Sequence, residues 1–226
     1  MSTALVVGAD RGIARAIAIA LADRGDNVFA ACLGDKPDLS KPGITVIGGV
    51  DVTSDAAVAR MASDLTARKV RIDALYHVAG ILLMDELGSI NFNDVRRQFE
   101  VNAIGPLRTV QAVAHLLDTG SKVGIVTSRV ASLGDNHTGG TYGYRMSKAA
   151  ANMAGLNLHH DLSKRGIAVL LLHPGMVATD LVPNYPHGPD HIKPEKAAEG
   201  LIKRMDELTL ESAGVFRHAN GELLPW

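Results

Sequence analysis

A tyrosine and a lysine stand four residues apart in the second half of the chain, at Tyr144 and Lys148. In a helix this spacing puts both side chains on one face, one turn apart. A free phenol has a pKa of about 10 and exchanges protons poorly at neutral pH, but a nearby ammonium group lowers that pKa. The pair therefore predicts general acid–base chemistry in which Tyr144 exchanges a proton with a substrate.

Two polar residues upstream would complete such a site. Ser128 follows the apolar run 123–127, so it leaves the carboxyl end of an expected strand, where open α/β sheets bind ligands. Its hydroxyl would hydrogen-bond a substrate carbonyl oxygen; the alternative is a turn or helix cap. Asn102 lies in a long predicted helix, which asparagine favours little. It would loosen a turn and hold a water molecule, or else it faces solvent.

A glycine-rich turn follows the first apolar run, with the sequence Gly8-Ala-Asp-Arg-Gly12-Ile-Ala. Gly8 permits a tight turn, and Gly12 lets the backbone approach a phosphate. The helix that begins there offers free N–H groups and the positive end of its dipole to a pyrophosphate. The turn predicts a dinucleotide site, and a plain strand-to-helix turn is the alternative.

The residues at the end of the second apolar run bear on which dinucleotide is bound. NAD sites usually have an acidic residue there, which binds the ribose hydroxyls. This chain has Cys32, Leu33 and Gly34, and the nearest acid, Asp35, comes slightly late. Arg11 would lie beside the adenosine ribose and bind an extra 2′-phosphate in a bidentate contact. We therefore expect NADP rather than NAD.

Short apolar runs alternate with helical stretches along almost the whole chain, as expected for strands covered on both faces. The runs that predict strands are 4–7, 28–33, 44–48, 74–78, 123–127, 168–172 and a short one at 215–216, and the predicted helices are 12–24, 54–67, 91–117, 143–164 and 194–207. Such repeats give parallel strands joined by right-handed crossovers. They predict one Rossmann-type α/β domain over residues 1–226, with a doubly wound sheet and helices on both faces.

Composition excludes several classes of protein. The 226 residues include 23 Lys and Arg against 24 Asp and Glu, which argues against a nucleic-acid or polybasic membrane partner. One cysteine rules out an internal disulfide and fits a reducing cytosol. No secretion signal or membrane-spanning run is evident, so we expect a cytoplasmic protein. His187 and His191 lack an evident third ligand, so we expect no metal.

Taken together, these residues resemble the short-chain dehydrogenase/reductase family over essentially the whole chain. The family's Thr-Gly-x3-Gly-x-Gly turn is matched around Gly8 and Gly12, with Val7 and Ala14 in place of the threonine and the third glycine. The helical asparagine, the serine after strand five and the Tyr-x3-Lys pair occur in the family's order. The gap between the serine and the tyrosine is slightly long, which implies a small insertion around residues 135–140. Three further segments match motifs of the family. They are Asp51-Val52, the last two residues of His77-Val78-Ala79-Gly80, and Pro174-Gly-Met-Val-Ala-Thr179.

The resemblance implies strand order 3-2-1-4-5-6-7, a cofactor half at about 1–120 and a catalytic half at about 121–226. It implies Asn102, Ser128, Tyr144 and Lys148 as the catalytic set, with Lys148 also binding ribose and Asn102 anchoring a water molecule. The implied cofactor contacts are Gly8, Asp10, Arg11, Gly12, Ile13, Cys32, Leu33, Asp51, Val52, Ala79, Gly80, Tyr144, Lys148, Pro174, Gly175, Val177 and Thr179. A homodimer or homotetramer is usual in the family.

A finer resemblance is to the C-factor-like carbonyl reductases of that family, carried by Tyr142–Lys148, His173–Val177 and the ending Asn220–Trp226. It implies NADP(H)-dependent reduction of a ketone or aldehyde by hydride transfer, with Tyr144 as proton donor. Two alternatives stay open: an NADP-binding sensor or signalling protein with little turnover, and a reductase of carrier-bound ketoacyl chains. The intact catalytic set disfavours a sensor, and no basic cluster indicates an acidic carrier. The substrate is not readable from the sequence, although the short loop 182–194 favours a small or open pocket.

Overall fold

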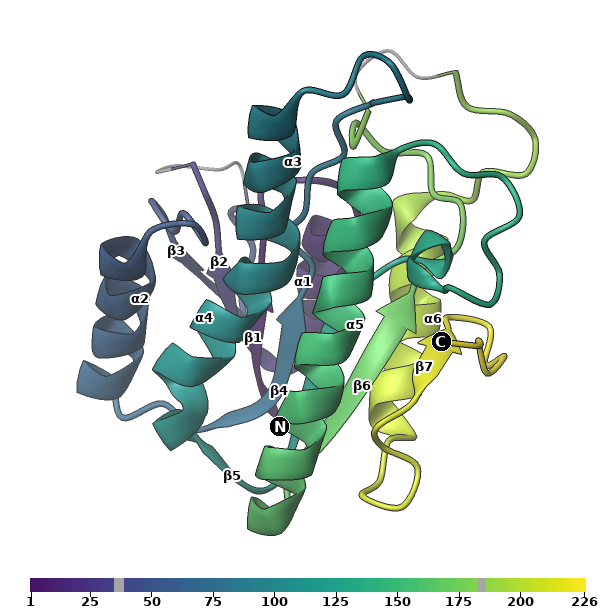
Figure 1. The fold of residues 1–226 in the computed structure, drawn as a ribbon. Coiled ribbons are helices and arrows are strands. Elements are labelled where there is room, and N and C mark those ends of the chain that lie inside the picture. Colours follow the sequence, from purple (N-terminus) through teal and green to yellow (C-terminus); the bar gives the residue numbers. More distant parts are fainter. Residues whose placement is uncertain (35–38, 183–185) are drawn as a thin grey trace.

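A computed structural model describes residues 1–34, 39–182 and 186–226. Seven parallel strands form one sheet in the order β3-β2-β1-β4-β5-β6-β7 (Figure 1), which confirms the predicted fold and strand order. The strands are β1 (Thr3–Val7), β2 (Asn27–Ala31), β3 (Ile44–Ile47), β4 (Ile72–His77), β5 (Leu117–Val126), β6 (Ala168–His173) and β7 (Phe216–His218). Because the order reverses between β1 and β4, the carboxyl ends of these two strands flank the point at which such sheets bind ligands.

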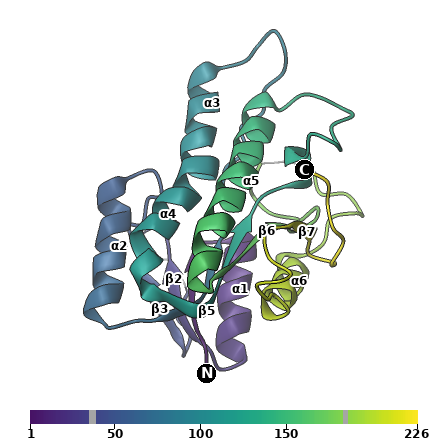
Figure 2. The same cartoon turned by 60° about the horizontal axis from the view of Figure 1, so that its bottom comes forward.

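Helices cover both faces of the sheet (Figures 1 and 2). On one face, α1 (Gly12–Asp23) and α6 (Pro194–Asp206) pack around an apolar layer that includes Ala4 and Val6. On the other face, α2 (Asp55–Ala67), α4 (Gly105–Val113) and α5 (Tyr142–Leu162) cover a layer that includes Leu5 and Val7. Successive residues of β1 therefore enter opposite layers, which explains why its sequence is continuously apolar.

The predicted helix 91–117 is broken in the structure. It divides into α3 (Phe92–Phe99), a π-helical turn (Glu100–Ile104), α4 and a 3₁₀ turn (Ala114–Leu116). The strand that follows also begins earlier than predicted, at Leu117. Its residues 118–120 are exposed and polar, and its pairing with β4 is irregular at that end. Apolar periodicity alone could not show that these solvated residues belong to a strand.

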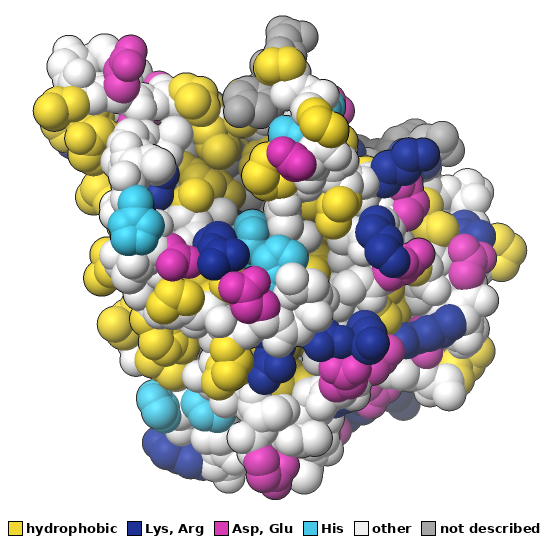
Figure 3. Space-filling model, turned by 90° about the vertical axis from the view of Figure 1, so that its right-hand side faces the viewer, with side chains coloured by type: hydrophobic (Ala, Val, Ile, Leu, Met, Phe, Trp, Pro, Cys, Tyr) yellow, Lys and Arg dark blue, Asp and Glu magenta, His cyan; other side chains and the backbone are white. Residues whose placement is uncertain are grey.

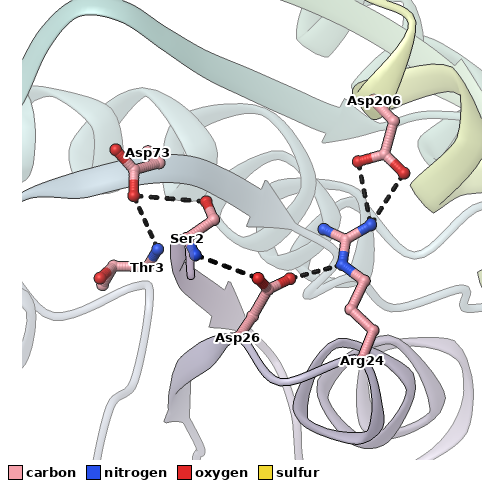
Figure 4. Close-up of polar contacts among 6 residues, drawn as sticks. All are labelled: Ser2, Thr3, Arg24, Asp26, Asp73 and Asp206. Atoms are coloured by element: carbon pink, nitrogen blue, oxygen red, sulfur yellow. Dashed lines mark hydrogen bonds and ion pairs between the residues drawn. The ribbon is translucent and has the colours of Figure 1, made fainter.

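Polar contacts tie together the amino-terminal end of the sheet, opposite the end where ligands are expected (Figure 4). Arg24, just after α1, donates to Asp26 over 2.5 Å and to both carboxylate oxygens of Asp206 at the end of α6, over 3.0 and 2.8 Å. Asp26 also accepts the backbone N–H of Ser2 over 3.1 Å. These contacts join α1 and α6, the two helices of one face, to the start of β1. They lie at the end of the sheet opposite the carboxyl ends of the strands.

In the part of the chain that the structure describes, none of the helices combines the length and apolar character needed to cross a membrane.

Candidate active site

A cleft of about 1010 Å³ opens along the carboxyl ends of the strands. In the space-filling view the top of the molecule is hollowed, and hydrophobic side chains lie along the hollow (Figure 3). Most of the cofactor and catalytic residues predicted from the sequence line this cleft, although they come from segments far apart in the chain. They are Gly8, Asp10, Arg11, Gly12, Ile13, Leu33, Asp51, Val52, Ala79, Gly80, Tyr144, Lys148, Pro174 and Thr179.

The glycine-rich turn packs closely against two other walls of the cleft. Gly8 has a positive φ of 89°, and a Cβ there would lie only 2.8 Å from the backbone of Ala79. A Cβ on Gly12 would lie 3.4 Å from Cγ2 of Thr179. The absence of both side chains therefore lets the turn after β1 meet the segments after β4 and β6. The N–H groups of Gly8 and Ala9 donate to the carbonyl of Ala31 and hold the turn against the end of β2.

Asp10 brings a carboxylate to the end of β2, where the sequence itself has none. Its two oxygens accept the backbone N–H groups of Leu33 and Gly34, each over 2.8 Å. The glycine-rich turn thus places a carboxylate next to the position after β2 where NAD sites usually have an acid. Sequence reasoning missed this, because Asp10 reaches Gly34 across 24 positions. The late acid Asp35 lies outside the described residues.

Two arginines line the cleft with no hydrogen-bond or ion-pair partner among the described residues, Arg11 on the glycine-rich turn and Arg97 on α3. Arg11 was predicted from its place in the turn. Arg97 was not, because an exposed arginine on an amphipathic helix carries no signal of a binding site. Both guanidinium groups are available to an anionic ligand such as a phosphate.

Tyr144 lies on the first turn of α5 and is 7% exposed. Burial raises the pKa of its phenol to about 12, although a hydrogen bond with the side chain of Ser128 acts in the opposite direction. The spacing of Tyr144 and Lys148 alone predicts a lowered pKa for the phenol. The ammonium nitrogen lies 5.9 Å from the centre of the ring, and burial of the phenol is the larger of the two causes that set its pKa. The phenol is therefore protonated at neutral pH, the form that donates a proton.

Lys148 is 4% exposed, and its Nζ donates to the backbone carbonyl of Val126 over 3.0 Å. Burial lowers the pKa of this ammonium group to about 8. Keeping a buried ammonium group charged costs free energy. Because Lys148 also lines a cleft large enough for a ligand, it is a candidate functional residue.

Asn102 is buried in the π-helical turn and does not face solvent. Its Nδ2 donates to the carbonyl of Ile81 over 2.9 Å and to Ser147 Oγ over 3.0 Å, and its Oδ1 accepts the N–H of Ile81 over 2.9 Å. A Cβ on Gly80 would lie 3.2 Å from both Asn102 Oδ1 and Lys148 Nζ. Gly80 therefore keeps open a small polar space between these two side chains.

Three predicted cofactor contacts do not face the cleft. The Cys32 side chain is fully buried, donates weakly to the carbonyl of Ala30 and is packed in the core, so its thiol is removed from the cofactor set. Gly175 and Val177 lie beside the cleft rather than in its wall. Val177 bridges to Ile192, which braces the segment before α6.

Of the two loops that the sequence singled out, one is only partly described. Residues 183–185 of the loop 182–194 lie outside the described residues. His187 and His191 have ring centres 5.2 Å apart, and the described residues contain no group of three possible metal ligands. The segment 135–140 is braced by Arg145, which donates to Gly140, Asn136 and Thr138.

The chain matches the short chain dehydrogenase family over residues 2–189. It is 59% identical over 226 residues, the full length of both chains, to 1-hydroxy-2-glutathionyl-2-methyl-3-butene dehydrogenase of Rhodococcus sp. (strain AD45). It is 40% identical to the C-signal protein of Myxococcus xanthus over 159 residues, 69% of this chain and 93% of that one. The NADPH-bound carbonyl reductase from chicken fatty liver has the same fold, with a TM-score of 0.91 over 100% of this chain and 99% of that one at 23% identity. This protein therefore belongs to the short-chain dehydrogenase/reductase family and is an NAD(P)-dependent oxidoreductase.

Proposed function

We propose that this protein interconverts a ketone or aldehyde and the corresponding alcohol, and that at neutral pH it works as an NADP(H)-dependent carbonyl reductase. The observation that carries the proposal is a buried phenol, Tyr144, hydrogen-bonded to Ser128 in the wall of a cleft large enough for a dinucleotide and a small substrate. A general acid must hold its proton at the working pH, and burial keeps this one protonated.

The residues that line the cleft are suited to bind a dinucleotide. The helix α1 begins at Gly12, and the first N–H groups of a helix have no partner within it. Arg11 has a guanidinium with no partner among the described residues. Gly80 keeps a polar space open between Asn102 and Lys148, of a kind that suits ribose hydroxyls. The bound nicotinamide supplies the hydride, and the protein supplies position and electrostatics.

Each catalytic side chain has a separate task in this scheme. Ser128 holds the substrate oxygen beside the phenol, and Tyr144 donates the proton to that oxygen. Lys148 binds ribose hydroxyls and provides a positive charge near the phenol as it loses its proton. Asn102, whose Oδ1 faces the space beside Lys148, anchors a water molecule that returns a proton from solvent.

We propose that NADP is favoured through Arg11, which lines the cleft next to Asp10 in the chain and can bind a 2′-phosphate. Asp10 limits this preference, since its carboxylate at Leu33 and Gly34 repels a phosphate and accepts hydroxyl groups. We therefore expect both dinucleotides to bind, with a modest advantage for NADPH.

The proposal is tested by steady-state oxidation of NADPH with phenanthrenequinone and benzaldehyde as probe substrates. We expect turnover in the wild type and a loss of at least about 100-fold in kcat for Tyr144→Phe, because the phenyl ring has no proton to give. Retention of most of the turnover by Tyr144→Phe would refute the assignment. A protein that binds NADPH tightly yet turns over none of the probes would instead favour a sensor.

A second candidate concerns the substrate class and rests on the relative from Rhodococcus, which is 59% identical over the whole chain. That relative is named for oxidation of an alcohol that carries a glutathionyl group. Arg97 is an exposed cation on the cleft wall with no partner among the described residues, and a glutathionyl group carries two carboxylates. Oxidation of 1-hydroxy-2-glutathionyl-2-methyl-3-butene, compared with the same alcohol lacking the peptide, tests this candidate directly.

A further inference from the structure

The amino end of the catalytic helix α5 is capped by a residue from elsewhere in the chain. The preceding residue, Thr141, has a left-handed backbone with φ 42°, and its side chain makes no capping hydrogen bond. Instead the carboxylate of Asp85, 57 positions before Tyr142, accepts the backbone N–H groups of Tyr142 and Gly143, the latter over 2.8 Å. The backbone carbonyl of Asp85 accepts the N–H of Thr141 over 3.0 Å. A carboxylate suits this place, because helix starts leave N–H groups unbound and carry a partial positive charge.

The close approach of Asp85 depends on a glycine at position 143. A Cβ there would lie 2.5 Å from Nε2 of Gln98, 3.1 Å from a carboxylate oxygen of Asp85 and 3.2 Å from Cα of Val95. No larger residue fits without displacing either α3 or the carboxylate. The absence of a side chain at Gly143 therefore leaves room for the carboxylate of Asp85. The next residue in the chain is Tyr144.

Asp85 ends a short segment, residues 81–85, which we call the strap. The strap is bound at its start by Asn102, through two hydrogen bonds of 2.9 Å with the backbone of Ile81. At its middle the N–H of Leu83 donates to Oε1 of Gln98 over 3.0 Å. Asn102 and Gln98 are both almost completely buried. The strap thus links the end of β4 and the π-helical turn to the first turn of α5.

We propose that Asp85 is a positioning residue that sets where the Tyr144 phenol stands relative to Ser128. The proposal rests on the proposed function, in which Tyr144 donates the proton. The bonds of Asp85 end one and two residues before Tyr144, so their loss lets the first turn of the helix unwind or shift. A displacement of about 1 Å in a reacting group can lower a rate by about 100-fold.

A positioning role and a purely structural role predict different results. A purely structural cap lowers the free energy of unfolding and leaves kcat of the folded protein unchanged. A positioning role lowers kcat, while the affinity for the dinucleotide stays the same because the glycine-rich turn and Lys148 are untouched. The two roles can therefore be separated on folded protein.

The test compares Asp85→Ala and Asp85→Asn with Glu86→Gln, a matched control whose exposed side chain is the next carboxylate in the same loop. We expect Asp85→Ala to lose about 10- to 100-fold in kcat with phenanthrenequinone, with KM and the Kd of NADPH within about threefold of wild type. Asp85→Asn keeps one acceptor oxygen and recovers part of the loss. Hydrogen exchange measured by mass spectrometry should be faster over residues 142–145 in Asp85→Ala and unchanged in Glu86→Gln.

The proposal is overturned if Asp85→Ala keeps the kcat of Glu86→Gln, whatever happens to its melting temperature. Should Asp85→Ala not fold, Asp85→Asn and Gly143→Ala replace it, since a Cβ at position 143 displaces α3 or the carboxylate. Wild-type kcat in both variants overturns the proposal. If Tyr144→Phe proves fully active, the proposed function fails. The exchange of residues 142–145 would then still report whether Asp85 holds the helix start.

Discussion

The carboxylate of Asp10 accepts the backbone N–H of Gly34 over 2.8 Å, so an acidic group from the turn after β1 stands at the end of β2. Its other oxygen is held by Leu33 in the same way. A carboxylate has about four acceptor sites, so both oxygens can still receive hydroxyl groups. Beside it, Arg11 offers the opposite charge. The proposed preference for NADP over NAD therefore depends on the balance of these two neighbouring residues.

Removal of the Asp10 charge should shift this balance towards NADP. We expect Asp10→Asn to lower the Kd of NADPH and raise that of NADH, each by about 3- to 10-fold, because like-charge repulsion of a phosphate is lost together with an acceptor for hydroxyls. Arg11→Ala should weaken NADPH and leave NADH unchanged. Fluorescence titration of the two reduced dinucleotides measures both constants. Asp23→Asn, which removes a charge at the far end of α1, is the control. If Asp10→Asn changed the Kd of NADPH and the Kd of NADH by the same factor in the same direction, the prediction would be contradicted.

The apolar strands and most of the residues that line the cleft could be predicted because local patterns encode them, and the strand order because the chain resembles a known family. Apolar runs bounded by glycine and aspartate mark β1 and β4, and the spacing of Gly8 and Gly12 marks the phosphate turn. The contacts that sequence reasoning missed link residues far apart in the chain, as Asp10 does with Gly34 and Asp85 with Gly143. Such contacts depend on how strands and helices meet, and no periodicity within one element reports them.

The pKa of Tyr144 was misjudged for a related reason. The sequence shows that Lys148 is one turn away, but it does not show how completely the phenol is removed from water. Burial depends on the packing of the segments around the cleft, and it raises the pKa to about 12. Lys148 is itself buried, and its Nζ is bound to the carbonyl of Val126. Tertiary packing therefore decides the sign of the shift.

The raised pKa of Tyr144 predicts opposite pH dependences for the two directions of the reaction. Reduction needs the protonated phenol, which predominates at pH values below about 12, so this group imposes no loss of reduction between pH 6 and 9. Oxidation of an alcohol needs the phenolate, so the logarithm of kcat/KM should rise with pH with a slope of about one. Ser128→Ala should raise the phenol pKa further, since the hydrogen bond with Ser128 lowers it.

Difference absorbance of tyrosinate, with Tyr144→Phe subtracted, measures this pKa without any substrate. Ser132→Ala is the matched control, because Ser132 is buried in the same segment but donates to the backbone of Trp226. A phenol that titrates at the same pH in Ser128→Ala and in the wild type would show that this hydrogen bond has no effect on its acidity.

Lys148 should lower the stability of the protein at neutral pH. Its pKa falls from 10.5 in the unfolded reference to about 8 when buried, so between these values the unfolded chain binds more protons. The free energy of unfolding of the wild type should therefore rise with pH between about 8 and 10.5. Lys148→Met removes the buried charge, and we expect it to be more stable at pH 7 by about 1 to 3 kcal/mol while losing turnover.

The stability gain of Lys148→Met should shrink as the pH rises from 8 towards 10.5, because the wild-type lysine then becomes neutral in the folded state. Urea unfolding at pH 7, 8.5 and 10, followed by far-UV circular dichroism, measures it. Lys203→Met, which removes an exposed charge on α6, should change stability by less than about 0.5 kcal/mol. A gain that is the same at pH 7 and pH 10 would mean that better apolar packing, and not the buried charge, separates the variant from the wild type. A variant less stable than wild type at pH 7 would mean that the bond to Val126 outweighs the cost of burying the charge.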